Sequence, residues 1–191
     1  MNQTKEDVMV LNYDDTFTKD MAEKSEATVV FFSRLHTLDK GVFLKNGVIT
    51  LVDEDKEIGF FKPEELKILG GHNVENVMAA VAIAYYMGID VDTIKTVTKN
   101  FAGVEHRIEY VGTVDGTMYY NDSKGTNPDA AIKAVEAMIR PTLLIGGGYD
   151  KKVPFDDWVK TFEGKVKLLV LLGQTAKDIA ACCDKHGYKD Y

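Results

Sequence analysis

The stretch NDSKGTNPDAAIKAVEAMIRPTLLIGG (residues 121–147) contains the end of one strand, a helix and a second strand. Asn127 is a favoured helix N-cap, and Pro128 suits the first helical position, where a backbone N–H would have no intrahelical partner. The residues that follow have the apolar spacing of an amphipathic helix, which predicts a helix over 127–140. The short apolar run 142–147 predicts a strand. The stretch therefore predicts a strand-helix-strand unit.

The same alternation continues toward the end of the chain. Helices are predicted over 154–163 and 175–186, on either side of the strand VKLLVLLG (166–173). Strands that alternate with helices are typical of βαβ units and a mostly parallel sheet, so this half is predicted to be α/β. Ligands of such sheets bind outside the carboxyl ends of the strands. Open sheets of this type usually carry about five or six strands, so we expect this one to be incomplete.

The first third of the chain is predicted to be rich in strands, and one more hairpin is predicted further along. The dipeptides Asn46-Gly47 and Asp115-Gly116 are both strong signals for hairpin turns. The predicted strands and hairpins are ATVVFFS (27–33), VFLKNGVITLV (42–52), EIGFF (57–61) and IEYVGTVDGTMYYND (108–122), and the predicted helices cover 72–89 and 91–101. The helical pattern gives way to an extended segment near 101–107. This change predicts two domains, 1–103 and 104–191.

The composition is that of a soluble globular protein, with 45% hydrophobic and 28% charged residues among 191. No apolar run approaches the ~20 residues that cross a bilayer, and the N-terminus lacks the pattern of a secretory signal. The two cysteines, Cys182 and Cys183, are neighbours and poorly suited to a structural disulfide, which indicates a reducing, cytoplasmic setting. The net charge of −7 argues against a nucleic-acid partner, but not against a nucleotide ligand.

The first candidate site is GGHNVENVMAA, at the start of a predicted helix. Asn73 and Asn76 are three residues apart and share one helix face, with His72 beside them. Two side-chain amides can read the edge of a base, because each carries donors and an acceptor. The alternative is helix capping, for which asparagine is well suited.

The second candidate is VEHRIEY, at the predicted domain boundary. The planar guanidinium of Arg107 could clamp a phosphate or a ribose. The alternative is a surface salt bridge with Glu105 or Glu109. His106 is interpreted as a hydrogen-bonded structural histidine.

The third candidate is NDSKGTNP, at a strand end. Asp122 could accept hydrogen bonds from ribose hydroxyls, and Ser123, Lys124 and Thr126 lie beside it. The alternative, a turn followed by an N-cap, accounts for Asn127 and Pro128. It does not account for the polar residues ahead of them.

The fourth candidate is LLIGGGYDKKVPF, a strand that ends in three glycines and continues into Asp150, Lys151 and Lys152. Glycines at this place let the backbone approach a ligand closely. The alternative is a glycine-rich turn with solvated lysines. Neither G-x-G-x-x-G nor the phosphate loop G-x-x-x-x-G-K-[ST] occurs in the chain.

Taken in order, these four stretches resemble the later part of a Mur ligase. The form NDSK-x-TNP resembles the branch of the family that adds D-glutamate to a UDP-linked muramoyl-alanine, and the resemblance extends to LNYDD near the start. It implies an ATP- and Mg²⁺-dependent cytoplasmic enzyme of peptidoglycan synthesis that works through an acyl phosphate. It also implies the end of a central ATPase domain (1–103) followed by an incomplete Rossmann-like C-terminal domain (104–191).

The resemblance assigns roles to particular residues. Asn73 and Asn76 match adenine-contacting asparagines, and Arg107 and Asp122 match a hinge arginine and a ribose-binding aspartate. Thr126 and Lys151 match residues that hold the carboxylates of D-glutamate. Ser123, Lys124 and His72 are further candidates without an assigned role.

Other parts of the family pattern are missing from this sequence. The phosphate loop, the Mg²⁺ ligands and a carbamylated lysine are expected upstream, so no catalytic residue or metal ligand is assigned within the chain. We expect it to have no ligase activity by itself and to be a monomer whose partners are small molecules, without nucleic acid or membrane. Two alternatives stay open: a non-catalytic nucleotide- or amino-acid-binding module derived from a Mur ligase, and a nicotinamide oxidoreductase.

Overall fold

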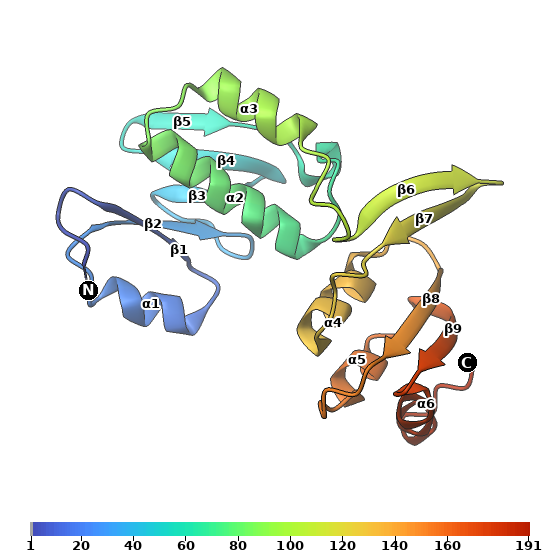
Figure 1. Cartoon of the computed structure of the whole chain (residues 1–191). Coiled ribbons are helices and arrows are strands. Elements are labelled where there is room, and N and C mark those ends of the chain that lie inside the picture. Colours follow the sequence, from blue (N-terminus) through green and yellow to red (C-terminus); the bar gives the residue numbers. More distant parts are fainter. Residues whose placement is uncertain (1) are drawn as a thin grey trace. The chain divides into compact units, whose positions relative to one another are not determined.

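The backbone of residues 2–191, which the computed structural model describes, divides into two units (Figure 1). The first unit ends at Ala102 and the second spans Gly103–Tyr191. Each unit has its own hydrophobic core, and each is described by itself. None of the helices in residues 2–191 is long and apolar enough to cross a membrane.

The first unit contains a mixed sheet in the order β1-β2-β3-β4-β5. Its strands are β1 (Val8–Asn12), β2 (Thr28–Ser33), β3 (Gly41–Lys45), β4 (Val48–Asp53) and β5 (Lys56–Gly59). Neighbours β1, β2 and β3 run parallel, whereas β3, β4 and β5 form antiparallel hairpins. The hairpin turn predicted at Asn46-Gly47 is confirmed, and both residues have the positive φ that this dipeptide tolerates.

The helices of the first unit are α1 (Thr16–Ala22), the short 3₁₀ turn η1 (Pro63–Glu65), α2 (Gly71–Tyr86) and α3 (Val91–Asn100). The two long helices confirm the predictions over 72–89 and 91–101. Helix α2 buries Val74, Val77, Met78 and Val81, a spacing of three and four residues that makes one apolar face. This face packs into the core with sheet residues such as Val42.

Strand β1 and helix α1 were not predicted from the sequence. Strand β1 has five residues and is followed almost at once by α1, whose N-cap is Asp15. Thr28–Phe32 of β2 pair in parallel with β1, so β1 depends on a partner some twenty residues away in sequence. Short strands of this kind carry too little local pattern to be recognised by periodicity.

The second unit contains a hairpin and a parallel strand pair. Its elements are β6 (Glu109–Val114), β7 (Thr117–Asn121), α4 (Pro128–Ala137), β8 (Thr142–Gly148), α5 (Asp156–Lys160), β9 (Val166–Gly173) and α6 (Ala176–Lys185). Strands β8 and β9 are parallel, as the βαβ pattern predicted. The predicted hairpin β6-β7 is confirmed, and it forms a sheet of its own.

Two helices of this unit are shorter than predicted. Helix α4 ends at Ala137 rather than residue 140, and Met138 is already extended, with ψ 131°. The proline at position 141 disfavours helical backbone in the residue before it, so the helix ends ahead of it. Helix α5 covers only Asp156–Lys160 of the predicted 154–163.

The two faces of the β8-β9 pair differ in burial. On one face, Leu169 packs with Trp158, Phe162 and other core residues of the second unit. On the other face lie the exposed apolar side chains Leu143, Ile145, Leu168, Val170 and Leu172. Within residues 2–191 this apolar face stays open, which is unusual for a strand pair in an α/β domain.

Candidate functional site

The candidate asparagines of the first unit lie in the first two turns of α2. The side-chain amide of Asn73 donates to the backbone oxygen of Leu69 at 2.8 Å. The amide of Asn76 donates to Oδ1 of Asn73 at 3.2 Å. The two amides therefore form a short chain along one helix face, and the more distant one, Asn76, is exposed to solvent.

Helix capping by an asparagine, the alternative for this stretch, is wrong. The N-cap is Gly70, whose φ of 96° favours glycine, and no side chain caps the helix. Asn73 bonds backward to the residue before the cap instead. His72, the third candidate here, lies half-buried in the first turn of α2.

An ion pair fixes the start of α2 to the end of β2. Nε of Arg34 lies 2.8 Å from Oε1 of Glu75, and both side chains are partly buried. The guanidinium also passes over Gly71, where a Cβ atom would lie 3.1 Å from Cζ of Arg34. Glycine at position 71 thus lets the arginine lie against the first turn that carries the asparagine pair.

Sequence reasoning did not single out the hydrogen-bond network of Asp14, although LNYDD was part of the family resemblance. The Asp14 carboxylate accepts from Ser33 Oγ at 2.5 Å and from the backbone N–H of Arg34 at 2.8 Å. Nδ1 of His36 lies 2.9 Å away. Burial opposes ionisation, but the hydrogen bonds from Ser33, His36 and the backbone hold the pKa of Asp14 below its usual value. Asp14 therefore orders the loop from which Arg34 reaches Glu75.

In the second unit, the NDSKGTNP turn wraps around Asp122. Oδ1 of Asp122 accepts from the backbone N–H of Ile108 at 3.0 Å, and the carbonyl of Asp122 accepts from Gly125 at 2.8 Å. The N–H of Lys124 donates to the carbonyl of His106 at 3.1 Å. The turn is thus held against residues 106–108, which brings two of the sequence candidates together.

Thr126 and Lys151 also come together, although 25 residues separate them in sequence. Nζ of Lys151 donates to the backbone oxygen of Thr126 at 2.8 Å, and both residues are exposed. Lys152 points elsewhere and pairs with Oδ2 of Asp150 at 2.5 Å. The two adjacent lysines are therefore distinguished by their contacts, and only Lys151 reaches the turn.

The salt bridge considered for Arg107 is not the one that forms. His106 lies 3.4 Å from Glu109 and 4.0 Å from Glu105, while Arg107 has no carboxylate partner among residues 2–191. The ring of His106 also contacts the amide of Asn121 at 2.9 Å, which fits its predicted structural role. Arg107 is exposed, and its guanidinium carries five N–H donors.

The capping role predicted for the end of the turn is confirmed. Oδ1 of Asn127 accepts from the N–H of Ala130 at 2.9 Å, and Pro128 occupies the first helical position of α4. Ser123 lies in the turn and its N–H donates to Oδ1 of Asn121 at 3.0 Å.

Gly125 is required for the shape of this turn. A Cβ atom there would lie 2.2 Å from Oδ2 of Asp122, so the Asp122 carboxylate would have to move. We expect Gly125→Ala to break the hydrogen bond to Ile108 and lower the free energy of unfolding of the second unit by about 1–2 kcal/mol. Urea denaturation followed by tryptophan fluorescence measures this. Gly112→Ala is the control, because its Cβ would meet nothing within 4 Å. Equal effects of the two substitutions would contradict the explanation.

Comparison with known families matches both units of the chain. The middle domain of Mur ligases matches residues 1–84, and the Mur ligase glutamate ligase domain matches residues 106–190. The chain therefore belongs to the Mur ligase family and carries sequence of its middle and C-terminal domains.

The similar proteins of known sequence carry the name of one branch of the family. A protein of Lachnoclostridium phytofermentans named UDP-N-acetylmuramoylalanine--D-glutamate ligase is 50% identical over 99% of this chain. A protein of the same name from Clostridioides difficile is 49% identical over 100% of it. In both comparisons the chain spans 42% of the length of the relative.

Solved structures show the same fold at low sequence identity. MurF from Acinetobacter baumannii covers 92% of this chain with a TM-score of 0.65 and 20% identity, and the match spans 40% of that protein. Folylpolyglutamate synthase from Thermotoga maritima covers 88% with a TM-score of 0.57 and 18% identity, over 41% of its length. At these low identities the likenesses show the fold alone.

Proposed function

We propose that this chain is a segment of the ATP-dependent UDP-N-acetylmuramoyl-L-alanine:D-glutamate ligase, MurD. The observation that carries the proposal is the roughly half-identical match to proteins of that name along nearly the whole chain. The parent enzyme would phosphorylate the carboxylate of its UDP-linked substrate in the cytoplasm, and the amine of D-glutamate would attack the resulting acyl phosphate. The chain's contribution would be binding and orientation.

The nucleotide contacts are proposed from donor and acceptor chemistry. The exposed amide of Asn76, steadied by Asn73, suits the edge of an adenine, since an amide donates and accepts side by side. Asp122 suits ribose hydroxyls, because a carboxylate accepts from two of them. Arg107, with no carboxylate partner among residues 2–191, suits a phosphate or ribose oxygen.

The D-glutamate contacts are proposed for Thr126 and Lys151. A dicarboxylate is held best by a cation together with hydroxyl and backbone donors. One N–H of the Lys151 ammonium donates to the carbonyl of Thr126, and the other two can donate to a carboxylate. The contact holds the ammonium at the backbone of Thr126, and in this proposal the ammonium and the Thr126 hydroxyl face one ligand.

Mg²⁺ and the ATP phosphates would be held by residues outside this chain. The phosphate loop G-x-x-x-x-G-K-[ST], which cradles the phosphates in such enzymes, does not occur in the chain. Magnesium would neutralise phosphate charge during phosphoryl transfer in the intact enzyme. We therefore expect the chain by itself to be inactive.

A ligase assay on two proteins tests the proposal. The 191-residue chain should release no phosphate from ATP in response to D-glutamate and the UDP-linked acceptor. The protein encoded by the complete reading frame, including an upstream G-x-x-x-x-G-K-[ST] loop, should do so. Turnover by the 191-residue chain would contradict the need for outside residues.

Two further measurements separate the alternatives. A reading frame that begins at Met1 and stops after Tyr191 would favour a non-catalytic binding module over a ligase segment. Specific quenching or enhancement of NADH fluorescence by the chain would instead favour an oxidoreductase, which the missing G-x-G-x-x-G motif argues against.

A further inference from the structure

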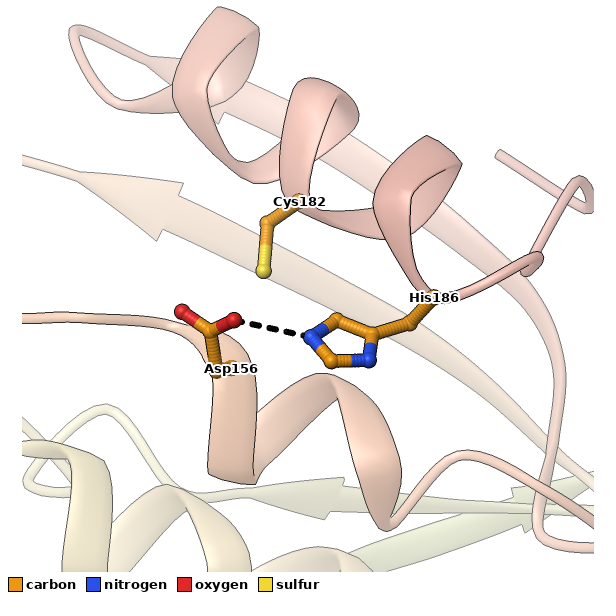
Figure 2. A group of neighbouring side chains, drawn as sticks. All are labelled: Asp156, Cys182 and His186. Carbon is orange, nitrogen blue, oxygen red and sulfur yellow. Dashed lines mark hydrogen bonds and ion pairs between the residues drawn. The ribbon is translucent and has the colours of Figure 1, made fainter.

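Three potential metal ligands meet between α5 and α6, in a part of the second unit that the proposed ligase function does not use (Figure 2). Asp156 is the first residue of α5, Cys182 lies in α6, and His186 is the C-cap of α6. Cys182 and His186 are four residues apart, so they project from the same side of the helix. Their ligand atoms and a carboxylate oxygen of Asp156 all lie within 4.8 Å of one another.

The contacts of the group show how the three side chains are oriented. Nε2 of His186 lies 2.8 Å from Oδ1 of Asp156, at the surface of the protein. Sγ of Cys182 points toward both groups in Figure 2 and is half-buried. The neighbouring Cys183 is fully buried in the core and is not part of the group.

We propose that Asp156, Cys182 and His186 form a binding site for a zinc-class divalent cation. Thiolate, imidazole and carboxylate are the three ligand types that zinc accepts, and a site with three protein ligands leaves one position for water. Ligand atoms around a tetrahedral zinc lie roughly 3.3–3.8 Å apart, so small side-chain rotations suffice from the observed separations. The thiol makes Mg²⁺ and Ca²⁺ poor occupants, because both prefer oxygen.

The protonation states of the free site oppose binding in part. Hydrogen bonds from Lys185 and His186 lower the pKa of Asp156 to about 2, so its carboxylate is already ionised. Burial raises the pKa of Cys182, so its thiol starts protonated. As the metal–sulfur bond forms, the S–H bond breaks and its proton passes to solvent.

Lys185 competes with the metal for Asp156. Its ammonium lies 2.5 Å from Oδ1 of Asp156, and a bound cation would have to displace it or use the other carboxylate oxygen. Removing this lysine should therefore tighten binding, whereas removing a ligand should weaken it. This opposite response distinguishes a metal site from a simple cluster of hydrogen-bonded side chains.

Titration of the 191-residue chain with Co²⁺ tests the site, because Co²⁺ replaces zinc and gives a charge-transfer absorption only when a thiolate is bound. We expect the band in the unmodified chain and its removal by excess Zn²⁺. Cys182→Ala should abolish the band, and His186→Gln should weaken binding by more than the ~10–100-fold typical of outer-shell changes. Lys185→Gln should strengthen it.

Cys183→Ala is the matched control and should keep the band, since Cys183 lies outside the group. Circular dichroism tests whether each variant is folded. If Cys182→Ala does not fold, His186→Gln tests the site instead, because it changes a side chain near the surface. No thiolate band in the unmodified chain would overturn the proposal. So would a band that survives Cys182→Ala, or weaker binding by Lys185→Gln.

Discussion

Replacing Lys151 with alanine in the intact ligase is expected to raise the KM for D-glutamate about tenfold to hundredfold, because losing a charge-assisted contact costs roughly 1.5–3 kcal/mol. The KM for ATP should change by no more than about twofold, since one contact is lost from one substrate. Steady-state kinetics with each substrate varied in turn measures both constants. The structural basis is the position of the Lys151 ammonium, 2.8 Å from the carbonyl of Thr126 at the proposed substrate turn.

The adjacent lysine supplies the control for this experiment. Lys152 carries the same charge one residue along, but it pairs with Asp150 and its side chain is 87% exposed. Lys152→Ala should therefore leave both KM values nearly unchanged. Equal rises in the two KM values for Lys151→Ala would show that the lysine has been assigned to the wrong substrate.

A second substitution separates substrate binding from support of the turn. Thr126→Ala removes a hydroxyl but keeps the carbonyl that Lys151 contacts. If Thr126 binds D-glutamate, its variant should also raise the KM for D-glutamate. If the Thr126 hydroxyl does not contact D-glutamate and the Lys151 contact only supports the turn, Thr126→Ala should have no kinetic effect.

Replacing Phe162 with alanine is expected to lower the free energy of unfolding of the second unit by about 3–5 kcal/mol. Phe162 is 1% exposed and lies edge-on to Trp158 and Tyr188, with ring centroids 4.9 and 5.3 Å away. Truncation removes both aromatic contacts and leaves a cavity at the centre of the core. The free energy of unfolding of a domain is about 5–15 kcal/mol in total, so such a loss removes a large part of it.

The chain contains a built-in probe for this measurement. Its one tryptophan, Trp158, lies in the same core, so tryptophan fluorescence reports unfolding of the second unit. Urea denaturation should show a lower midpoint for Phe162→Ala. Tyr149→Ala, at an 81% exposed aromatic residue of the same unit, should change the midpoint little. Similar losses for the two variants would contradict the importance of this core.

Local chemistry made much of the fold predictable. Asn46-Gly47 and Asp115-Gly116 form hairpin turns because few other residues tolerate two successive positive φ angles. Helix α2 follows from the apolar spacing of Val74, Val77, Met78 and Val81. Asn127 and Pro128 start α4 as predicted, because capping acts within one helical turn. In each case the cause lies within a few residues of its effect.

The predictions that failed depend on strand pairing and backbone geometry, which the local sequence pattern does not show. Strand β1 is short and is stabilised by pairing with β2. The residues of β1 alone do not indicate this pairing. Capping by an asparagine, the alternative considered for the start of α2, does not occur: Gly70 is the N-cap, and the amide of Asn73 donates to the backbone oxygen of Leu69. His106, rather than Arg107, contacts Glu105 and Glu109. Which of two neighbouring side chains meets a carboxylate depends on backbone geometry, and His106 has a φ of 66°.

The sequence by itself determined the turns, the long helices, the βαβ pattern and the motifs that resemble a Mur ligase. The tertiary structure decided which distant side chains meet: Lys151 with Thr126, Asp14 with Ser33, and Asp156 with His186. These partners are some twenty to thirty residues apart, so no local propensity brings them together. They meet because packing of the apolar faces fixes the strand ends and helix ends that carry them.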